Sequence, residues 1–287
     1  MSTSGEPFTR PQAWSPQPPP QPSAAQEPIV VFDDVSIGFD QKPVLENISF
    51  QIRPGEMRIL LGPAGVGKSV LLKLTNGLLR PDSGRIFVFG KEISAMREQD
   101  LFEIRGRIGT VFQEGALFDS LTVRDNVGYR LLEEHLPDGE ITARATEALR
   151  FVELEGTLNK FPSELSGGMR RRVAIARAIV TNPQLILYDS PTGGLDPITS
   201  TTIIELVMKQ RDISHTSSIV VTHRLQDAFV LAMHRFDLAH NQMEALPPHQ
   251  TDPNTSFLML HQGRLVFDGT TAELIHSQDP FIHEYIR

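Results

Sequence analysis

The segment Gly62–Ser69, GPAGVGKS, constrains the fold more than any other part of the sequence. It fits the pattern G-x-x-x-x-G-K-S/T in full, and it follows the short apolar run RILL at 58–61. Glycines let successive backbone amides converge on phosphate oxygens, and the N-terminus of a following helix favours anions. In this pattern the lysine reaches the β- and γ-phosphates, and the next hydroxyl ligates Mg²⁺. The sequence therefore predicts a nucleoside triphosphate site with Lys68 and Ser69 in these roles.

Three short apolar runs predict the centre of a parallel sheet. RILL is the first, LILY at 185–188 is the second and SIVVT at 218–222 is the third. Because each alternates with a helical pattern, both faces of the sheet are expected to be covered. Two helices are expected to bury an apolar stripe; these stripes are Leu71, Leu74 and Leu78 in one, and Leu225, Ala228, Phe229 and Ala232 in the other.

Composition narrows the class of protein. The chain has 287 residues, of which 40% are hydrophobic and 22% charged, as in ordinary globular proteins. It has no cysteine, which excludes disulfides and thiolate metal sites and fits a reducing compartment. No apolar run reaches the roughly 18–20 residues needed to cross a bilayer. The net charge of −8 disfavours a protein that coats nucleic acid, but it does not disfavour a nucleotide site, which needs only local positive charge.

The chain divides into a tail and one domain. Residues 1–28 are rich in proline and glutamine and predict a disordered tail, whereas 29–287 have globular patterning. The runs IVVFDDVSIGF (29–39) and NISFQI (47–52) predict an antiparallel pair joined through DQKPVLE (40–46). Near the C-terminus, FLMLHQGRLVFDG predicts a hairpin turning at Gln262-Gly263. Thr270 and Glu273 are placed to form a capping box for a final helical region.

Two further stretches interrupt this α/β pattern. Residues 114–165 are mostly helical in pattern, with a Pro-Asp-Gly break at 137–139, and predict a helical subdomain of about residues 114–170 inserted into the core. Residues 234–256 are polar and contain prolines, so we expect a long loop there.

Two more motifs bear on the nucleotide. Asp189 ends the apolar run LILY, where a carboxylate can hold Mg²⁺ beside the phosphate loop. The segment LSGGM, 165–169, opens a helix with glycines, which leave backbone N–H groups free to face an anion. That helix is expected to bury Val173, Ala176 and Ile179, and the three arginines at 170–172 are expected to form mainly a solvated or interface face.

GPAGVGKS, LSGGM and LILYD, in this order and spacing, resemble the nucleotide-binding domain of an ATP-binding cassette (ABC) transporter. The resemblance covers residues 29–287 and implies an α/β fold: a P-loop NTPase (RecA-like) core with an antiparallel β subdomain and an inserted helical subdomain. It implies ATP and Mg²⁺ as cofactors. It also implies a head-to-tail dimer in which each ATP lies between the phosphate loop of one copy and the LSGGM segment of the other.

The resemblance implies roles for individual residues of this chain. Phe39 would stack on adenine, Gln113 would touch Mg²⁺ and sense the γ-phosphate, and His223 would contact the γ-phosphate. Asp196 would be a dimer-contact residue, and Ser69, Gln113 and Asp189 would surround the metal. The catalytic group would comprise Lys68, Gln113, His223 and the position of Ser190. The remaining nucleotide contacts would be Gly62, Pro63, Ala64, Gly65, Val66, Gly67, Val70, Ser166, Gly167, Gly168 and Met169.

Finer details favour one subgroup. FQEGALFDSLTVRDNV (112–127) and the methionine of LSGGM resemble the Mla/Mce-associated ATPases, which energise lipid movement across bacterial envelopes. This resemblance implies a membrane permease as partner, a homodimer of the ATPase, an Mce-domain substrate-binding protein and a place on the cytoplasmic face of the inner membrane. A soluble ABC ATPase acting on nucleic acid or ribosomes is a competing class. Tandem domains, coiled-coil arms and zinc cysteines are typical of that class and are absent from the sequence.

Ser190 departs from the family pattern, in which a glutamate follows the aspartate. A serine hydroxyl can accept a hydrogen bond from the attacking water, but it cannot take up a proton at neutral pH. Three interpretations remain open. The chain hydrolyses ATP slowly with help from His223 or the γ-phosphate, or Glu114 supplies the carboxylate, or the chain pairs with a different subunit that keeps the glutamate. A nucleotide-dependent regulator that never hydrolyses ATP is a separate possible function, which Ser190 also leaves open.

Overall fold

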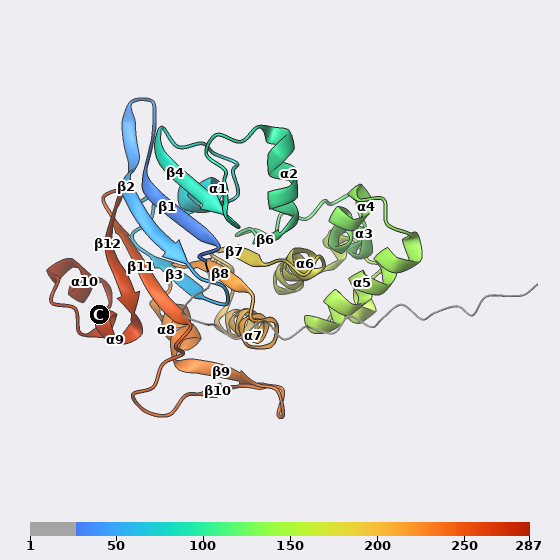
Figure 1. Ribbon diagram of the computed structural model, residues 1–287. Helices are drawn as coiled ribbons and strands as arrows, with labels where there is room; N and C mark the ends of the chain where they lie inside the picture. Colours follow the sequence, from blue (N-terminus) through green and yellow to red (C-terminus); the bar gives the residue numbers. More distant parts are fainter. Residues whose placement is uncertain (1–26) are drawn as a thin grey trace, which may run out of the picture.

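The computed structural model describes residues 27–287, so the proline-rich tail lies almost entirely outside the described residues. The centre is a six-stranded sheet in the order β12-β11-β3-β8-β7-β6 (Figure 1). All neighbours are parallel except the edge strand β12, which is antiparallel to β11. These strands are β3 (Met57–Leu61), β6 (Ile108–Val111), β7 (Leu185–Asp189), β8 (Ser217–Val221), β11 (Thr255–His261) and β12 (Arg264–Thr270). The three apolar runs are thus confirmed as neighbouring parallel strands.

Both faces of this sheet are buried, which explains why its strands are apolar without alternation. In β3, Ile59 and Leu61 pack into one hydrophobic cluster, while Leu60 packs into the other. The first cluster includes helices α6 (Gly167–Ile179), α7 (Pro197–Ser214) and α8 (Leu225–Met233). The second includes α1 (Lys68–Thr75) and α2 (Glu98–Gly106). The expected stripe of α1 was wrong at Leu78, because the helix ends at Thr75 and Leu78 is 52% exposed.

A four-stranded antiparallel sheet, in the order β2-β1-β4-β5, covers the α1 side of the core. Its strands are β1 (Val30–Phe39), β2 (Lys42–Ile52), β4 (Ser83–Val88) and β5 (Lys91–Glu92). The expected connector 40–46 was too long, since β2 already begins at Lys42 and the turn is Asp40-Gln41. Both turn residues have positive φ, which lets a two-residue turn join the strands closely.

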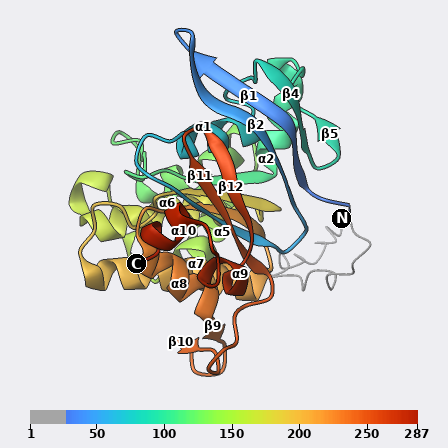
Figure 2. The same ribbon diagram turned by 90° about the vertical axis from the view of Figure 1, so that its left-hand side faces the viewer.

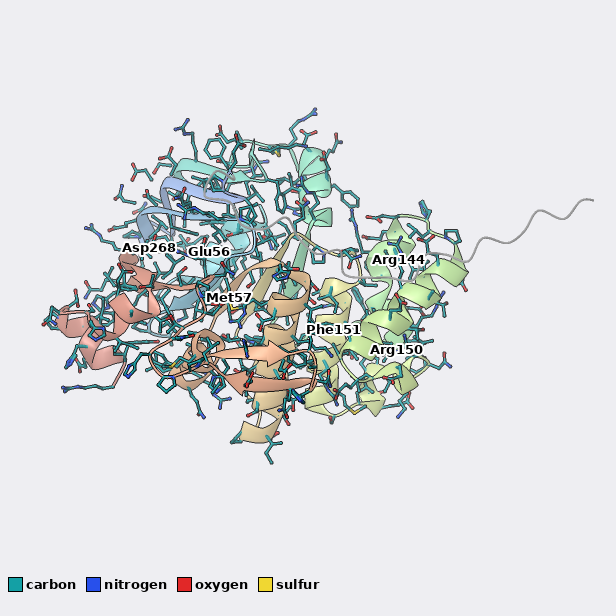
Figure 3. The ribbon with its side chains drawn as sticks, turned by 60° about the horizontal axis from the view of Figure 1, so that its bottom comes forward. Glu56, Met57, Arg144, Arg150, Phe151 and Asp268 are labelled. Carbon is teal, nitrogen blue, oxygen red and sulfur yellow. The ribbon has the colours of Figure 1, made fainter. Side chains whose placement is uncertain are left out.

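The helical subdomain lies on the opposite side of the molecule from this sheet (Figure 1). It contains α3 (Val123–Val127), α4 (Tyr129–Glu133), α5 (Asp138–Phe151) and two short 3₁₀ turns, Glu155–Thr157 and Pro162–Glu164. The expected break at 137–139 extends too far along the chain. Pro137 is the N-cap of α5, and Asp138 and Gly139 already belong to its first turn. Figure 3 shows Phe151 at the end of α5, facing the core, where the Lys209 ammonium of α7 lies 4.8 Å from its ring centre.

The expected loop 234–256 was wrong. It contains an antiparallel hairpin of β9 (His234–Asp237) and β10 (Gln242–Ala245), and β11 begins at Thr255. The hairpin packs on α7: the Phe236 amide donates to Asp212, and the Met243 amide donates to Glu205. Polar side chains face solvent on both short strands, so the sequence lacks the alternation that marks a half-buried strand.

The C-terminal region is built as the sequence predicts and then adds a helix. The β11–β12 hairpin turns at Gln262-Gly263, and Thr270 and Glu273 form the capping box of α9 (Thr271–Ile275). The last helix is α10 (Pro280–Tyr285), which lies near α9 in both ribbon views (Figures 1 and 2), and its Phe281 contacts His261 at the end of β11. Within β3, the buried Arg58 pairs with Glu56 and with Asp268 of β12, two residues that lie close together in Figure 3. Among residues 27–287, no helix is long and apolar enough to cross a membrane.

Tyr188→Phe is expected to stabilise the fold. The Tyr188 side chain is 1% exposed, its hydroxyl has no hydrogen-bond partner within 27–287, and burial raises its pKa. Because a buried unpaired hydroxyl costs free energy, its removal should raise the free energy of unfolding by about 1 kcal/mol. Urea denaturation measures this, with the partly exposed Tyr129→Phe as a control expected within about 0.5 kcal/mol of wild type. A loss of stability in Tyr188→Phe would contradict the expectation.

Candidate nucleotide site

The phosphate-loop segment links the end of β3 to the start of α1. Gly62, Gly65 and Gly67 have φ values of +145°, +77° and +106°, a region that favours glycine. A side chain at Gly62 would also meet the Leu260 carbonyl oxygen at 2.5 Å, and one at Gly67 would meet Leu45 at 2.7 Å. The backbone conformation therefore favours glycine at all three positions, and close packing also requires it at Gly62 and Gly67. The three glycines hold the loop where its amides, at the N-terminus of α1, can face an anion.

Lys68 lies inside this loop. Its side chain is 8% exposed, and its Nζ donates to the carbonyl oxygens of Gly62 and Pro63, each at 2.7 Å. Burial lowers the pKa of Lys68 below its usual value, and the negative charge of Asp189 opposes the shift. Because an ammonium has three N–H donors, two are used by the loop and one remains for a bound phosphate.

Asp189 and His223 lie at the same edge of the sheet as the phosphate loop. In the register of the parallel strands, Asp189 is level with Val221 of β8, and Val221 is level with Leu60 of β3. His223 follows β8, the strand between the other two, and is exposed. The carboxyl ends of three adjacent strands thus bring together Lys68, Asp189 and His223, the arrangement expected for a ligand at this edge of an open α/β sheet.

Ser190 has a constrained backbone. It is 7% exposed with φ +47°, its amide donates to the Val221 carbonyl at 2.9 Å, and its carbonyl accepts from the Gly193 amide at 2.9 Å. A positive φ in a non-glycine residue costs free energy and is frequent at functional sites. These hydrogen bonds fix the position from which the Ser190 side chain leaves the backbone.

A buried polar network surrounds this turn and was missed from the sequence. The Thr192 hydroxyl donates to the buried Asp227 carboxylate at 2.5 Å, and the Arg224 guanidinium donates to Ser200 at 2.6 Å. Arg224 also lies 3.7 Å from Asp227. The network joins the turn after β7 to the segment that carries His223. Thr192 and Asp227 gave no signal because each, on its own, looks like an ordinary turn or helix residue.

Gln113 follows β6, is exposed, and lies against the turn after Ser190. A side chain at Gly193 would meet Gln113 Cγ and Nε2, each at 3.4 Å. The structure therefore brings Gln113 close to the turn that follows Asp189, as its proposed metal role requires.

Arg171 contradicts the expectation of a solvated arginine face on α6. It is 5% exposed and donates to the carbonyls of Phe112, at 3.0 Å, and Gly193, at 3.2 Å. Further along α6, Arg177 donates to the carbonyls of Gly115 and Ala116. Burial lowers the pKa of both guanidinium groups, and for Arg171 the nearby exposed Glu114 opposes the shift. The charge of an arginine predicts a solvated position, but its five N–H donors also allow it to bind several carbonyl oxygens at once. The segment around Gln113 is thus fixed to α6.

The LSGGM segment forms the N-terminus of α6. Ser166 is the N-cap and accepts from the Met169 amide at 3.2 Å, while Gly167 is exposed. A side chain at Gly168 would meet the Thr199 methyl at 2.5 Å, so this segment lies directly against the start of α7. There Asp196 is the N-cap of α7, and hydrogen bonds from Thr199 lower the pKa of Asp196.

The remaining candidates differ in their exposure. Phe39, at the end of β1, is 44% exposed, and Ser69 is exposed at the start of α1. Pro63, Ala64 and Gly65 of the loop are exposed, whereas Val66 of the loop and Val70 of α1 are partly buried. α1 packs on β4, β7 and β8, whereas α6 packs on β6, α3, α5 and α7. The helix that follows the phosphate loop and the helix that begins with LSGGM thus pack on opposite faces of the central sheet.

Residues 45–193 match the family model described as "ABC transporter". This range runs from β2 through the phosphate loop, Gln113 and LSGGM to the turn after Ser190. The chain belongs to the ABC transporter family. It is an ABC ATPase, of the family in which ATP hydrolysis is coupled to transport.

Two relatives extend the match to most of the chain. The "Protein TRIGALACTOSYLDIACYLGLYCEROL 3, chloroplastic" of Arabidopsis thaliana is 38% identical over 262 residues, 88% of this chain and 71% of the relative. The "Intermembrane phospholipid transport system ATP-binding protein MlaF" of Haemophilus influenzae is 33% identical over 245 residues, 85% of this chain and 84% of MlaF. The resemblance to Mla-type ABC ATPases seen in the sequence is thus confirmed.

A solved structure gives the same result for the fold. The dimeric post-hydrolysis ATP-binding cassette MJ0796, bound to ADP and phosphate, is 29% identical to this chain and has a TM-score of 0.70. The match covers 84% of this chain and 98% of that structure. The predicted P-loop NTPase core with its antiparallel sheet is confirmed.

Proposed function

We propose that this protein is the ATP-binding subunit of a lipid transporter in a bacterial envelope. It would act on the cytoplasmic face of the inner membrane, where it would couple ATP binding and slow hydrolysis to substrate movement by a permease. The similarity to MlaF over 85% of the chain carries the cargo assignment. An Mce-domain substrate-binding protein would complete the system, as the sequence resemblance implies.

The nucleotide would be ATP with Mg²⁺. The residues of this chain fit both: Lys68 keeps one N–H donor for phosphate, and Ser69, Asp189 and Gln113 offer the oxygen ligands that Mg²⁺ prefers. The metal would neutralise charge on the β- and γ-phosphates. Phe39 would stack on the adenine.

We further propose a head-to-tail homodimer. α1, which follows the phosphate loop, and α6, which has an exposed N-terminus, pack on opposite faces of the central sheet, and both N-termini are suited to an anion. A second copy would place its Ser166 and Gly167 amides against the nucleotide held by the first, with Asp196 and the 82%-exposed Ile198 beside the contact. A heterodimer with a glutamate-bearing partner remains the alternative.

Slow hydrolysis follows from Ser190. The electrostatic groups around the phosphates are retained, and these usually supply the larger share of catalysis, whereas the glutamate whose general-base assistance is worth about 10²–10⁴-fold is absent. Of the two substitutes considered from the sequence, His223 follows the strand between the phosphate loop and Asp189. Glu114 is exposed, and its charge acts on the nearby Arg171. We therefore favour His223 or the γ-phosphate itself.

A cavity between the ATPase core and the helical subdomain would receive the permease. Its volume is about 270 Å³, and its lining combines exposed apolar side chains with guanidinium groups: Leu78, Phe112, Arg105, Arg130 and Arg177. It reaches both the end of α1 and the strand before Gln113. A permease segment seated there would touch the elements that contact ATP.

Leu78→Asp tests this docking surface. The 52%-exposed Leu78 lines the cavity, so a charge there should abolish co-purification with the multi-spanning permease while leaving ADP binding unchanged. Ile275→Asp, a similarly exposed apolar residue on α9, is the matched control and should co-purify normally. Equal co-purification of both variants would place the permease elsewhere.

ATP-dependent transfer of a fluorescent phospholipid between the purified complex and acceptor vesicles tests the cargo. Lys68→Met is the inactive control. Transfer of a water-soluble solute with no lipid movement would contradict the lipid assignment and leave the ATPase assignment intact.

A further inference from the structure

The last helix of the chain touches the first residue of the phosphate loop. The hydroxyl of Tyr285 donates to the Gly62 carbonyl at 3.0 Å and accepts from the Gly62 amide, with 3.3 Å between the heavy atoms. One side-chain oxygen thus binds both polar backbone groups of a residue 223 positions earlier in the sequence. Burial raises the pKa of Tyr285, so the hydroxyl remains a donor at neutral pH.

Gly62 is also the anchor of Lys68. The Lys68 ammonium donates to the same Gly62 carbonyl oxygen at 2.7 Å. Gly62 itself has φ +145° and lies so close to the Leu260 carbonyl that no side chain fits there. The position of the Gly62 carbonyl therefore determines where the Lys68 ammonium lies before a phosphate binds.

Tyr285 is held in place independently of the loop. On α10, Phe281 lies over the ring of His261 at the end of β11, with 3.7 Å between the ring centres, and 5.9 Å from the ring of Tyr285. Asp279 accepts from the amides of Phe281 and Ile282, and Ile282 is 1% exposed. The helix thus rests on β11, the neighbour of β3 in the parallel sheet.

We propose that Tyr285 is a positioning residue for nucleotide binding, which fixes Gly62 so that the phosphate loop and Lys68 are ordered before the phosphates arrive. Ordering a loop during binding lowers affinity, and a loop ordered beforehand avoids that loss. The inference rests on the proposed nucleotide site, and it is independent of the cargo and of the permease. It gives the C-terminal helix control over ATP affinity.

Tyr285→Phe tests the proposal, because it removes one oxygen and keeps the ring on Phe281. In the full-length chain, titration with ADP should show a dissociation constant raised about three- to tenfold, the range that corresponds to one hydrogen bond. The same rise should appear in the KM for ATP, with kcat changed less. The matched control is Tyr129→Phe, in the helical subdomain, which should bind ADP like wild type.

Two other results carry distinct meanings. The Tyr285→Phe variant could have a lower melting temperature without nucleotide and still bind ADP like wild type. The hydroxyl would then only stabilise the packing of the C-terminal helix, and the proposal would be overturned. If wild type itself binds no ADP, the nucleotide site proposed above fails, and the positioning role of Tyr285 fails with it. The wild-type titration separates these two failures.

Discussion

Replacing Ser190 by glutamate should raise ATP turnover by about 10²-fold or more, since general-base assistance is typically worth 10²–10⁴-fold. The backbone of Ser190 is fixed on both sides, by its amide to Val221 and its carbonyl to Gly193, so a longer side chain would leave from the same point. The left-handed φ of +47° is already present in the serine chain, so Ser190→Glu adds little backbone strain. Phosphate release by the full chain bound to its permease measures the change.

Ser190→Gln is the control for this prediction. Its side chain has the length and hydrogen-bonding reach of glutamate, but it cannot accept a proton at neutral pH. Turnover should therefore stay near the wild-type rate in Ser190→Gln and rise only in Ser190→Glu. His223→Ala should then lower the slow wild-type rate further.

A wild-type ATP turnover in the range of ordinary ABC ATPases would indicate that a group other than His223 or the γ-phosphate acts as the general base. If Ser190→Glu changes little and Glu114→Gln abolishes turnover while His223→Ala does not, the carboxylate of Glu114 performs the proton transfer. A wild-type rate of zero, restored on mixing with a glutamate-bearing cassette, would favour the heterodimer.

The parallel core could be predicted because its signal is local. Strands β3, β7 and β8 are continuous apolar runs, since both of their faces are buried, and each ends in a motif with its own chemistry. The β9–β10 hairpin could not be predicted. Its strands have four residues each and take their stability from α7, through hydrogen bonds to Asp212 and Glu205 that depend on the tertiary structure.

The candidate site divides in the same way. Residues in contiguous motifs, such as Lys68 and Asp189, could be assigned to the candidate site from the motifs alone. Arg171, Asp227 and Tyr285 were not, because each acts on a backbone or side chain distant in sequence. A charged or hydroxyl side chain on a helix has the same appearance in the sequence whether it faces solvent or fixes a loop.

Lys68→Met should weaken ADP and ATP binding by about 10²-fold or more and leave the fold intact. The ammonium is the only charged group supplied by the phosphate loop, and truncating one partner of a buried, hydrogen-bonded charge pair typically costs about 2–5 kcal/mol of binding free energy. Titration of the full chain with ADP, alongside phosphate release, measures the loss.

Stability separates this loss from unfolding. Because burial lowers the pKa of Lys68, its charged form is disfavoured in the folded state, and at pH 7 this penalty is fully present. As pH rises through the lowered pKa toward the unfolded value of 10.5, the penalty is lost and stability should increase in wild type. Lys68→Met removes that contribution to the pH dependence, and Tyr285 still satisfies the Gly62 carbonyl. The free energy of unfolding at pH 7 should therefore fall by no more than about 1 kcal/mol. A larger fall in the free energy of unfolding would mean that the two hydrogen bonds from Lys68 to carbonyl oxygens stabilise the loop. The loss of nucleotide binding would then result from a disordered loop rather than from the missing charge.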